Sequence, residues 1–85
     1  MRLTFSTQAW NEYLYWQTQD RKTLNKINRL LLSISRDGAA FGEGKPEKLK
    51  YGQGYSRRID EKNRLVYTAD ENEIKIESCY GHYEK

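Results

Sequence analysis

Residues 55–69 read YSRRIDEKNRLVYTA, a stretch whose pattern is typical of two strands joined by a tight turn. Apolar side chains fall on alternate positions, at Ile59 in the first half and at Leu65 and Tyr67 in the second. Asp60–Asn63 separates the halves and supplies turn residues, including an asparagine that tolerates left-handed backbone. The stretch therefore predicts an antiparallel β-hairpin.

The register of this hairpin decides where its arginines point. Suppose that Ile59 and Leu65 both face the core. The residue numbers of two directly opposite residues must then have an even sum, because opposite residues share a face. A three-residue loop gives that register and places Arg58 and Arg64 together on the other face. Two neighbouring arginines repel each other unless an anion lies between them, so the pair indicates a phosphate-binding surface. An ordinary polar sheet face is the alternative.

Two segments that precede the hairpin have apolar residues at helical spacing. Residues 8–18 carry a broad apolar face, and the steps from Leu24 to Ile34 are three or four residues. Because the joint between these helices is short, we predict a two-helix hairpin. The helix ends are expected at these residues: Ser6 or Thr7, Asp20 or Thr23, and Gly38.

The remaining sequence completes the fold class. Leu3–Phe5 suggests a short first strand, and the alternation around Ile74 and Ile76 suggests a last one. Residues 38–54 are rich in glycine and hold the only proline, which predicts a long, mostly irregular connection of the kind that carries function. We therefore predict that residues 1–85 form one α+β domain. A strand, the helix hairpin and a three-stranded antiparallel meander follow one another, with the helices packed on one face of a four-stranded sheet.

Composition excludes several classes of protein. The 85 residues are 36% hydrophobic, which allows one small core, and no apolar run approaches the ~20 residues of a membrane span. The single cysteine, Cys79, excludes an internal disulfide, and without an obvious base beside it we expect it to be a buried packing residue. We expect a cytoplasmic protein that needs no metal or cofactor.

A few side chains suit the cleavage of RNA without a metal. RNA carries its own nucleophile, the 2′-hydroxyl, so the enzyme must supply a base, cations for the phosphorane and an acid. Glu47 lies among three lysines, which favour its ionised form as a base, and Arg58 with Arg64 would be the cations. His82, the only histidine, would be the acid. A solvated charged loop around Glu47 and a structural or exposed histidine are the alternatives.

The following blocks occur in this order along the chain: Ser6 to Trp10, Tyr13-Leu14-Tyr15-Trp16, Lys26-Ile27-Asn28, Gly44-Lys45-Pro46-Glu47, Leu49-Lys50, Ser56-Arg57-Arg58-Ile59, Arg64-Leu65-Val66-Tyr67 and His82-Tyr83. Together they resemble the YoeB (Txe) family of toxins of bacterial type II toxin–antitoxin systems, within the RelE/ParE superfamily. The resemblance runs nearly end to end. The chain departs from many relatives in having Tyr80-Gly81 before the final His-Tyr, and in continuing with Glu84-Lys85.

The resemblance implies a RelE-like fold and a metal-independent endoribonuclease, an mRNA interferase that cleaves mRNA in the ribosomal A site and thereby inhibits translation. It assigns roles to six residues: Glu47 as general base, His82 as general acid, Arg64 in transition-state stabilisation, Tyr83 in the active site, and Lys50 and Arg58 in RNA or phosphate binding. The Glu47, arginine and His82 assignments agree with those made from the residues themselves.

The resemblance also implies partners. These are a YefM-type antitoxin, the ribosome with its mRNA, operator DNA bound through the toxin–antitoxin complex, and a second copy of the chain in a homodimer. No membrane partner is expected, and the bacterial cytoplasm is the expected location. Two other functions stay open: a ParE-like toxin that acts on gyrase and needs no acid–base set, and a non-catalytic RNA-binding module that uses tyrosine stacking.

Overall fold

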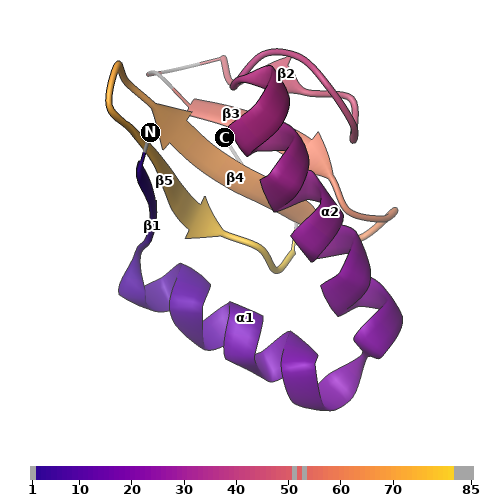
Figure 1. Ribbon diagram of the computed structural model, residues 1–85. Helices are drawn as coiled ribbons and strands as arrows, with labels where there is room; N and C mark the ends of the chain where they lie inside the picture. Colours follow the sequence, from indigo (N-terminus) through magenta and orange to yellow (C-terminus); the bar gives the residue numbers. More distant parts are fainter. Residues whose placement is uncertain (1, 51, 53, 82–85) are drawn as a thin grey trace.

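One mixed sheet of five strands carries two helices, in the order β1-β5-β4-β3-β2 (Figure 1). The computed structural model describes residues 2–50, 52 and 54–81. The elements are β1 (Arg2–Phe5), α1 (Thr7–Gln19), α2 (Arg21–Asp37), β2 (Glu47–Lys48), β3 (Gly54–Arg58), β4 (Arg64–Ala69) and β5 (Glu73–Ser78). β1 is parallel to β5, and every other neighbouring pair is antiparallel. The α+β class and the β3–β4–β5 meander are as predicted.

The prediction of four strands is wrong, because the connection from α2 to β3 contributes a fifth. β2 is only two residues long and pairs with β3 through Glu47 opposite Ser56 and Lys48 opposite Tyr55. A two-residue strand is too short to show an alternating pattern, so only its pairing partner defines it. The segment predicted to be irregular therefore supplies one edge of the sheet.

The helix ends follow the predicted capping residues. The Oγ of Ser6 accepts a hydrogen bond from the backbone N–H of Ala9 at 3.0 Å, and Asp20 Oδ1 accepts from the N–H groups of Lys22 and Thr23. Asp20 also ends α1, so a single residue joins the two helices. The chain doubles back there and the helices splay apart away from the joint, which gives an opened form of the predicted hairpin (Figure 1).

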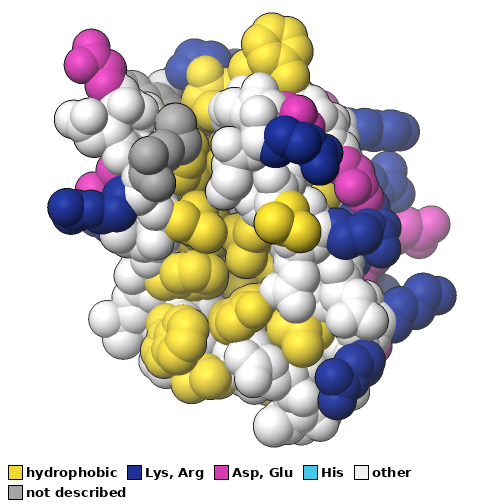
Figure 2. All heavy atoms as spheres, viewed as in Figure 1, with side chains coloured by type: hydrophobic (Ala, Val, Ile, Leu, Met, Phe, Trp, Pro, Cys, Tyr) yellow, Lys and Arg dark blue, Asp and Glu magenta, His cyan; other side chains and the backbone are white. Residues whose placement is uncertain are grey.

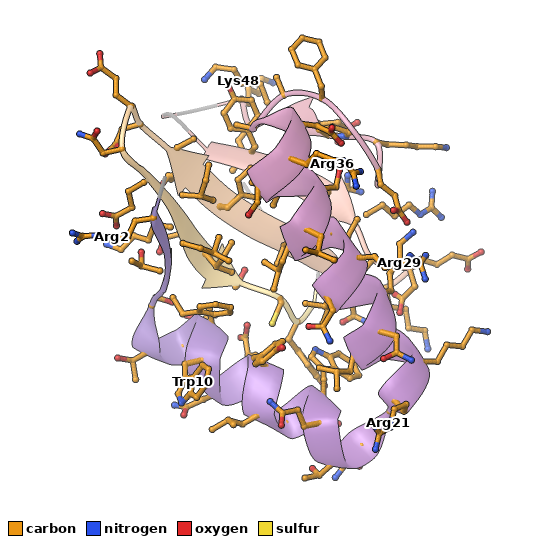
Figure 3. All side chains as sticks on the ribbon, viewed as in Figure 1. Arg2, Trp10, Arg21, Arg29, Arg36 and Lys48 are labelled. Carbon is orange, nitrogen blue, oxygen red and sulfur yellow. The ribbon has the colours of Figure 1, made fainter. Side chains whose placement is uncertain are left out.

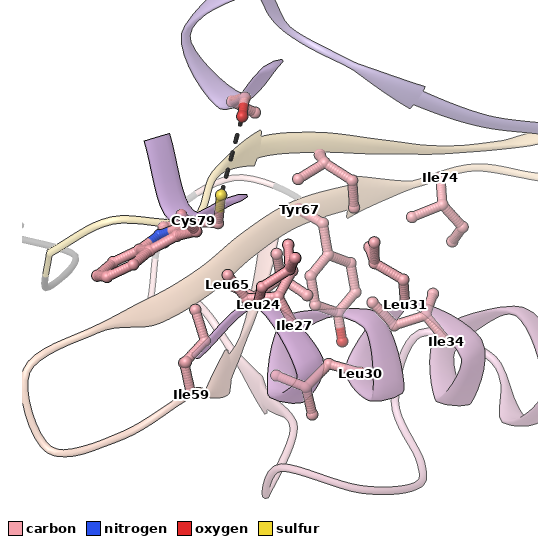
Figure 4. Close-up of a cluster of buried hydrophobic side chains, with 13 residues drawn as sticks. Leu24, Ile27, Leu30, Leu31, Ile34, Ile59, Leu65, Tyr67, Ile74 and Cys79 are labelled. Carbon is pink, nitrogen blue, oxygen red and sulfur yellow. Dashed lines mark hydrogen bonds between the residues drawn. The ribbon is translucent and has the colours of Figure 1, made fainter. Parts of the chain in front are cut away.

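The core lies between α2 and the sheet (Figure 4). The predicted stripe of α2 is buried against the side chains of β4 and β5, and Ala9 and Trp16 join it from α1. Cys79 is fully buried, and its carbonyl oxygen accepts a hydrogen bond from the indole of Trp16 at 2.9 Å. The prediction that Cys79 is a packing residue is confirmed. Within residues 2–50, 52 and 54–81, neither helix combines the length and apolar character needed to cross a membrane.

The β3–β4 hairpin has the predicted even register. Arg58 lies opposite Arg64 and Arg57 opposite Leu65, and the N–H of Ile59 donates to the carbonyl of Asn63 at 3.0 Å. Three loop residues therefore separate the paired positions. Because opposite residues share a face, Arg58 and Arg64 lie together on the face away from the core.

Candidate active site

An ion pair joins two residues that are far apart in the sequence, Glu47 on β2 and Arg64 at the start of β4. The Nη2 of Arg64 lies 3.0 Å from Oε1 of Glu47, and its Nε donates to the hydroxyl of Ser56 at 3.2 Å. The Arg64 side chain is 20% exposed and that of Glu47 is 68% exposed. Arg64 is thus held from two sides, while the carboxylate faces solvent, where a substrate can reach it.

Arg58 completes the cationic side of this site. It lies directly opposite Arg64 in the hairpin and is exposed. Its backbone N–H donates to the carbonyl of Gly44 at 2.7 Å, whereas its guanidinium has no partner among the described residues. The structure therefore brings together three of the predicted site residues: one carboxylate and two arginines, one of which is unpaired in the described part of the chain.

The chain returns to this site at the end of the described structure. The backbone N–H of Arg64 donates to the carbonyl of Gly81 at 2.9 Å, and the N–H of Gly81 donates to Oδ1 of Asn63 at 2.8 Å. Gly81 has φ +82°, a left-handed value that favours glycine. His82 and Tyr83, which are predicted to belong to the site, lie outside the described residues.

Lys50 is the sixth predicted site residue. It lies two residues beyond β2 and is exposed, and its side chain forms no hydrogen bond or ion pair with the other described site residues. The chain is anchored just before it, since the N–H of Leu49 donates to the carbonyl of Gly54 at 2.9 Å.

Chemically, this arrangement combines a proton acceptor with two multidentate donors. A carboxylate offers acceptor oxygens only, and a guanidinium presents a planar fork that matches the oxygens of a phosphate. Among the described residues no three His, Cys, Asp or Glu side chains form a group that could hold a metal ion. Burial raises the pKa of the Cys79 thiol to about 12, with Glu12 adding to the rise, so the thiolate that nucleophilic attack requires is scarce.

Arg57 is a residue whose role sequence analysis missed. It is fully buried, and its Nε donates to the hydroxyl of Tyr67 at 2.8 Å. Its other nitrogens donate to the following acceptors: the hydroxyl of Ser33 and the carbonyls of Gly38, Phe41 and Glu43, at 2.6–2.9 Å. These carbonyls belong to the connection that leads from α2 to β2. Arg57 therefore fixes the segment that carries Glu47. The sequence did contain a signal for this role. In the predicted register Arg57 lies opposite Leu65, so its side chain points toward the core.

Comparisons with known proteins agree with this architecture. Residues 5–83 match the family described as "YoeB-like toxin of bacterial type II toxin-antitoxin system". The toxin YoeB of Escherichia coli (strain K12) is 41% identical over 98% of this chain and 100% of the relative.

Solved structures agree as well. The YoeB dimer from Staphylococcus aureus superposes with a TM-score of 0.91 at 55% identity, covering 98% of both chains. A heterotetrameric YoeB–YefM toxin–antitoxin complex from the same organism gives a TM-score of 0.88 at 55% identity over the same coverage. With a family match over nearly the whole chain and full-length relatives above 40% identity, this chain belongs to the YoeB-like toxins of bacterial type II toxin–antitoxin systems.

Proposed function

We propose that this toxin is a ribosome-dependent endoribonuclease that cleaves mRNA in the ribosomal A site and so inhibits translation. The observation that carries the proposal is the contact of Glu47 with Arg64 at 3.0 Å, with Arg58 opposite Arg64 on the same face. This supports a site with a base and two cations on one exposed surface. A toxin that acted only by binding gyrase would need no such combination.

The proposed reaction uses the RNA 2′-hydroxyl and no metal. Glu47 accepts the 2′-hydroxyl proton, and the 2′-oxygen attacks the adjacent phosphorus. Arg64, together with Arg58, stabilises the charge that develops on the phosphorane oxygens. His82 donates a proton to the departing 5′-oxygen, leaving a 2′,3′-cyclic phosphate and a 5′-hydroxyl end. Lys50 and Tyr83 contact the RNA.

Two features of the structure support this division of roles. The solvent-facing carboxylate of Glu47 is within reach of a substrate, and the less exposed Arg64 is held in place by Ser56. A held guanidinium suits stabilisation of charge in the transition state, because no reorganisation is needed when that charge develops. The anchoring of Gly81 to Arg64 and Asn63 brings the chain to the site one residue before His82.

The proposed partners follow the relatives. The S. aureus toxin forms a complex with YefM and is also described as a dimer. We propose a YefM-type antitoxin and a homodimer for this chain, and operator DNA as a ligand of the toxin–antitoxin complex. The proposed location is the bacterial cytoplasm, where ribosomes are found.

The test is cleavage of ribosome-bound mRNA with mapping of the cut ends. We expect cuts in the A-site codon, with 2′,3′-cyclic phosphate ends, for the wild-type toxin. Arg64→Ala should lose more cleavage rate than RNA affinity, because Arg64 acts mainly in the transition state. Binding without any cut would leave the RNA-binding module as the function, and inhibition of gyrase without RNA cleavage would leave the ParE-like function.

A further inference from the structure

A hollow of about 270 Å³ adjoins the candidate active site on the side of α2. It is lined by Lys26 of α2, by Gly44 and Lys45 of the connection to β2, and by Arg58 and Ile59 at the end of β3. Three of these five residues are cations and none is an acid. Figure 2 shows lysine and arginine side chains gathered along the edge of the molecule beyond α2, and Arg29 projects from α2 toward this edge (Figure 3).

The cations of the hollow are poorly neutralised. The side chains of Lys45 and Arg58 have no partner among the described residues, and Lys26 lies 3.5 Å from Glu43. Glu43 is shared with Arg29, which is closer at 3.0 Å. The hydrogen bond from Arg29 is the main cause of the lowered pKa of Glu43. The carboxylate therefore belongs chiefly to Arg29, and the hollow keeps a positive charge that an anion can balance.

The backbone holds Lys45 at this place in a conformation that lysine rarely adopts. Lys45 has φ +53°, and it is the only non-glycine residue with a positive φ among residues 2–50, 52 and 54–81. The preceding carbonyl, that of Gly44, accepts the 2.7 Å hydrogen bond from the N–H of Arg58. This bond fixes the connection against the end of β3. A left-handed lysine beside an unpaired arginine is the kind of backbone feature found at ligand sites.

We propose that the hollow binds a second phosphodiester phosphate of RNA, next to the phosphate that is cleaved. This rests on the proposed function, which puts the scissile phosphate between Arg58 and Arg64. Arg58 is shared by the hollow and the candidate active site, since it lines the hollow and lies opposite Arg64. A strand that crosses the site would thus present successive phosphates to Arg64 and to the hollow. The phosphate belongs either to the substrate strand or to ribosomal RNA.

Binding of short RNAs tests the site. The probe is a trinucleotide with a 2′-O-methyl group at the scissile position, so that it binds without being cut. It is compared with versions in which one flanking phosphate is replaced by an uncharged methylphosphonate. The variants are Lys26→Gln/Lys45→Gln and, as a control with the same charge change, Lys62→Gln/Lys75→Gln at exposed positions that do not line the hollow. Lys45→Arg, which keeps the charge, should bind as the wild type does.

The expected result is that neutralising one flanking phosphate weakens wild-type binding and does not weaken that of Lys26→Gln/Lys45→Gln. One phosphate contact on a single strand contributes about 0.7 to the slope of log affinity against log salt, or roughly fivefold per tenfold change in salt. The double variant should lose about that slope, and the control should not. Thermal melting of each variant verifies that it is folded.

The source of the phosphate is decided by a second arm, affinity for empty ribosomes. If the double variant binds trinucleotides like the wild type but has lost ribosome affinity, the hollow holds a phosphate of ribosomal RNA. If both affinities equal those of the control variant, the proposal is overturned. Failure of the proposed function gives a different result. In that case the wild-type toxin never cuts ribosome-bound mRNA, yet it binds trinucleotides with the expected phosphate dependence. This outcome would support the phosphate site and contradict the proposed nuclease activity.

Discussion

The proposed reaction has two proton transfers, one to Glu47 from the 2′-hydroxyl and one from His82 to the departing 5′-oxygen. Each transfer by a positioned side chain is typically worth about 10²–10⁴-fold in rate. Glu47→Ala and His82→Ala should each slow the chemical step within that range, with little change in ribosome affinity. Glu71→Ala removes an exposed carboxylate in the β4–β5 turn and should leave the rate unchanged.

A sulfur substitution separates the two roles. When the 5′-oxygen is replaced by sulfur, the leaving group needs no proton. His82→Ala should regain much of its rate on this substrate, and Glu47→Ala should not. Equal rescue of both variants, or of neither, would contradict the assignment of acid and base.

The buried Arg57 makes a separate prediction about stability. Arg57→Met leaves the carbonyls of Gly38, Phe41 and Glu43 without their donor. We expect a clear loss in the free energy of unfolding, because each buried acceptor left without its donor costs about 1–3 kcal/mol. Arg57→Lys should also destabilise, because one ammonium cannot replace the planar fork.

Arg58→Met is the matched control, since it changes the neighbouring arginine on the exposed face. Urea denaturation should show a change within about 0.5 kcal/mol for this variant. If the two variants were equally stable, the hydrogen bonds of Arg57 would contribute nothing net to folding.

Strand parity explains which site residues could be predicted. Arg58 and Arg64 were placed on one face because Ile59 and Leu65 fix the register, and the structure has that register. The contact of Glu47 with Arg64 depends on β2, which the local sequence does not define. The roles of Glu47, Arg64, Arg58, Lys50, His82 and Tyr83 stay predictions.

At the scale of elements, the connection from α2 to β2 is held by close packing as well as by Arg57. Gly44 has φ +91°, and a Cβ there would lie 2.6 Å from Cδ2 of Leu30 and 3.1 Å from Cβ of Arg57. Gly44→Ala should therefore destabilise the fold by about 1–3 kcal/mol through overpacking, in addition to the cost of its backbone conformation.

Gly52→Ala is the control for this substitution. Gly52 also has a positive φ, +75°, but a Cβ there meets nothing within 4 Å. The difference in urea midpoint between the two variants measures the steric part. A Gly44→Ala protein as stable as Gly52→Ala would show that Leu30 moves aside freely.

The helices and the long strands were predictable, and β2 was not, for the same physical reason. Periodic patterns need several turns or several alternations, as in residues 24–34 and 55–69, to exceed the background of chance. The two residues of β2 are ordered instead by hydrogen bonds from β3 and by the network around Arg57.

At the scale of the whole molecule, three carboxylates that are at least partly exposed to solvent contribute to the dependence of stability on pH. The pKa values of Asp20, Asp37 and Glu43 are lowered, chiefly by side-chain hydrogen bonds from Thr23, Arg36 and Arg29, respectively. A lowered pKa means that the unfolded chain binds the proton more readily. The stabilisation is therefore complete above the ordinary pKa values and is lost as the pH falls through the lower, folded-state values.

We accordingly expect the urea midpoint to fall as the pH is lowered from about 5 to about 2. Glu43→Gln should reduce this dependence, and high salt should weaken it because the ion pairs are exposed. A midpoint that is constant over this pH range would contradict the lowered pKa values.

The parallel pairing of β1 with β5 has a consequence for the order of assembly. Leu3 pairs with Ile74 and Phe5 with Ile76, so this contact closes a loop that contains nearly all the other elements. Closing a long loop costs more chain entropy than forming the local β3–β4 and β4–β5 hairpins. We therefore expect the sheet to grow outward from its hairpins and β1 to join late. Ser6 donates from its hydroxyl to the carbonyl of Glu77 at 2.9 Å while it caps α1, so we expect the start of α1 to become fixed in the same late step.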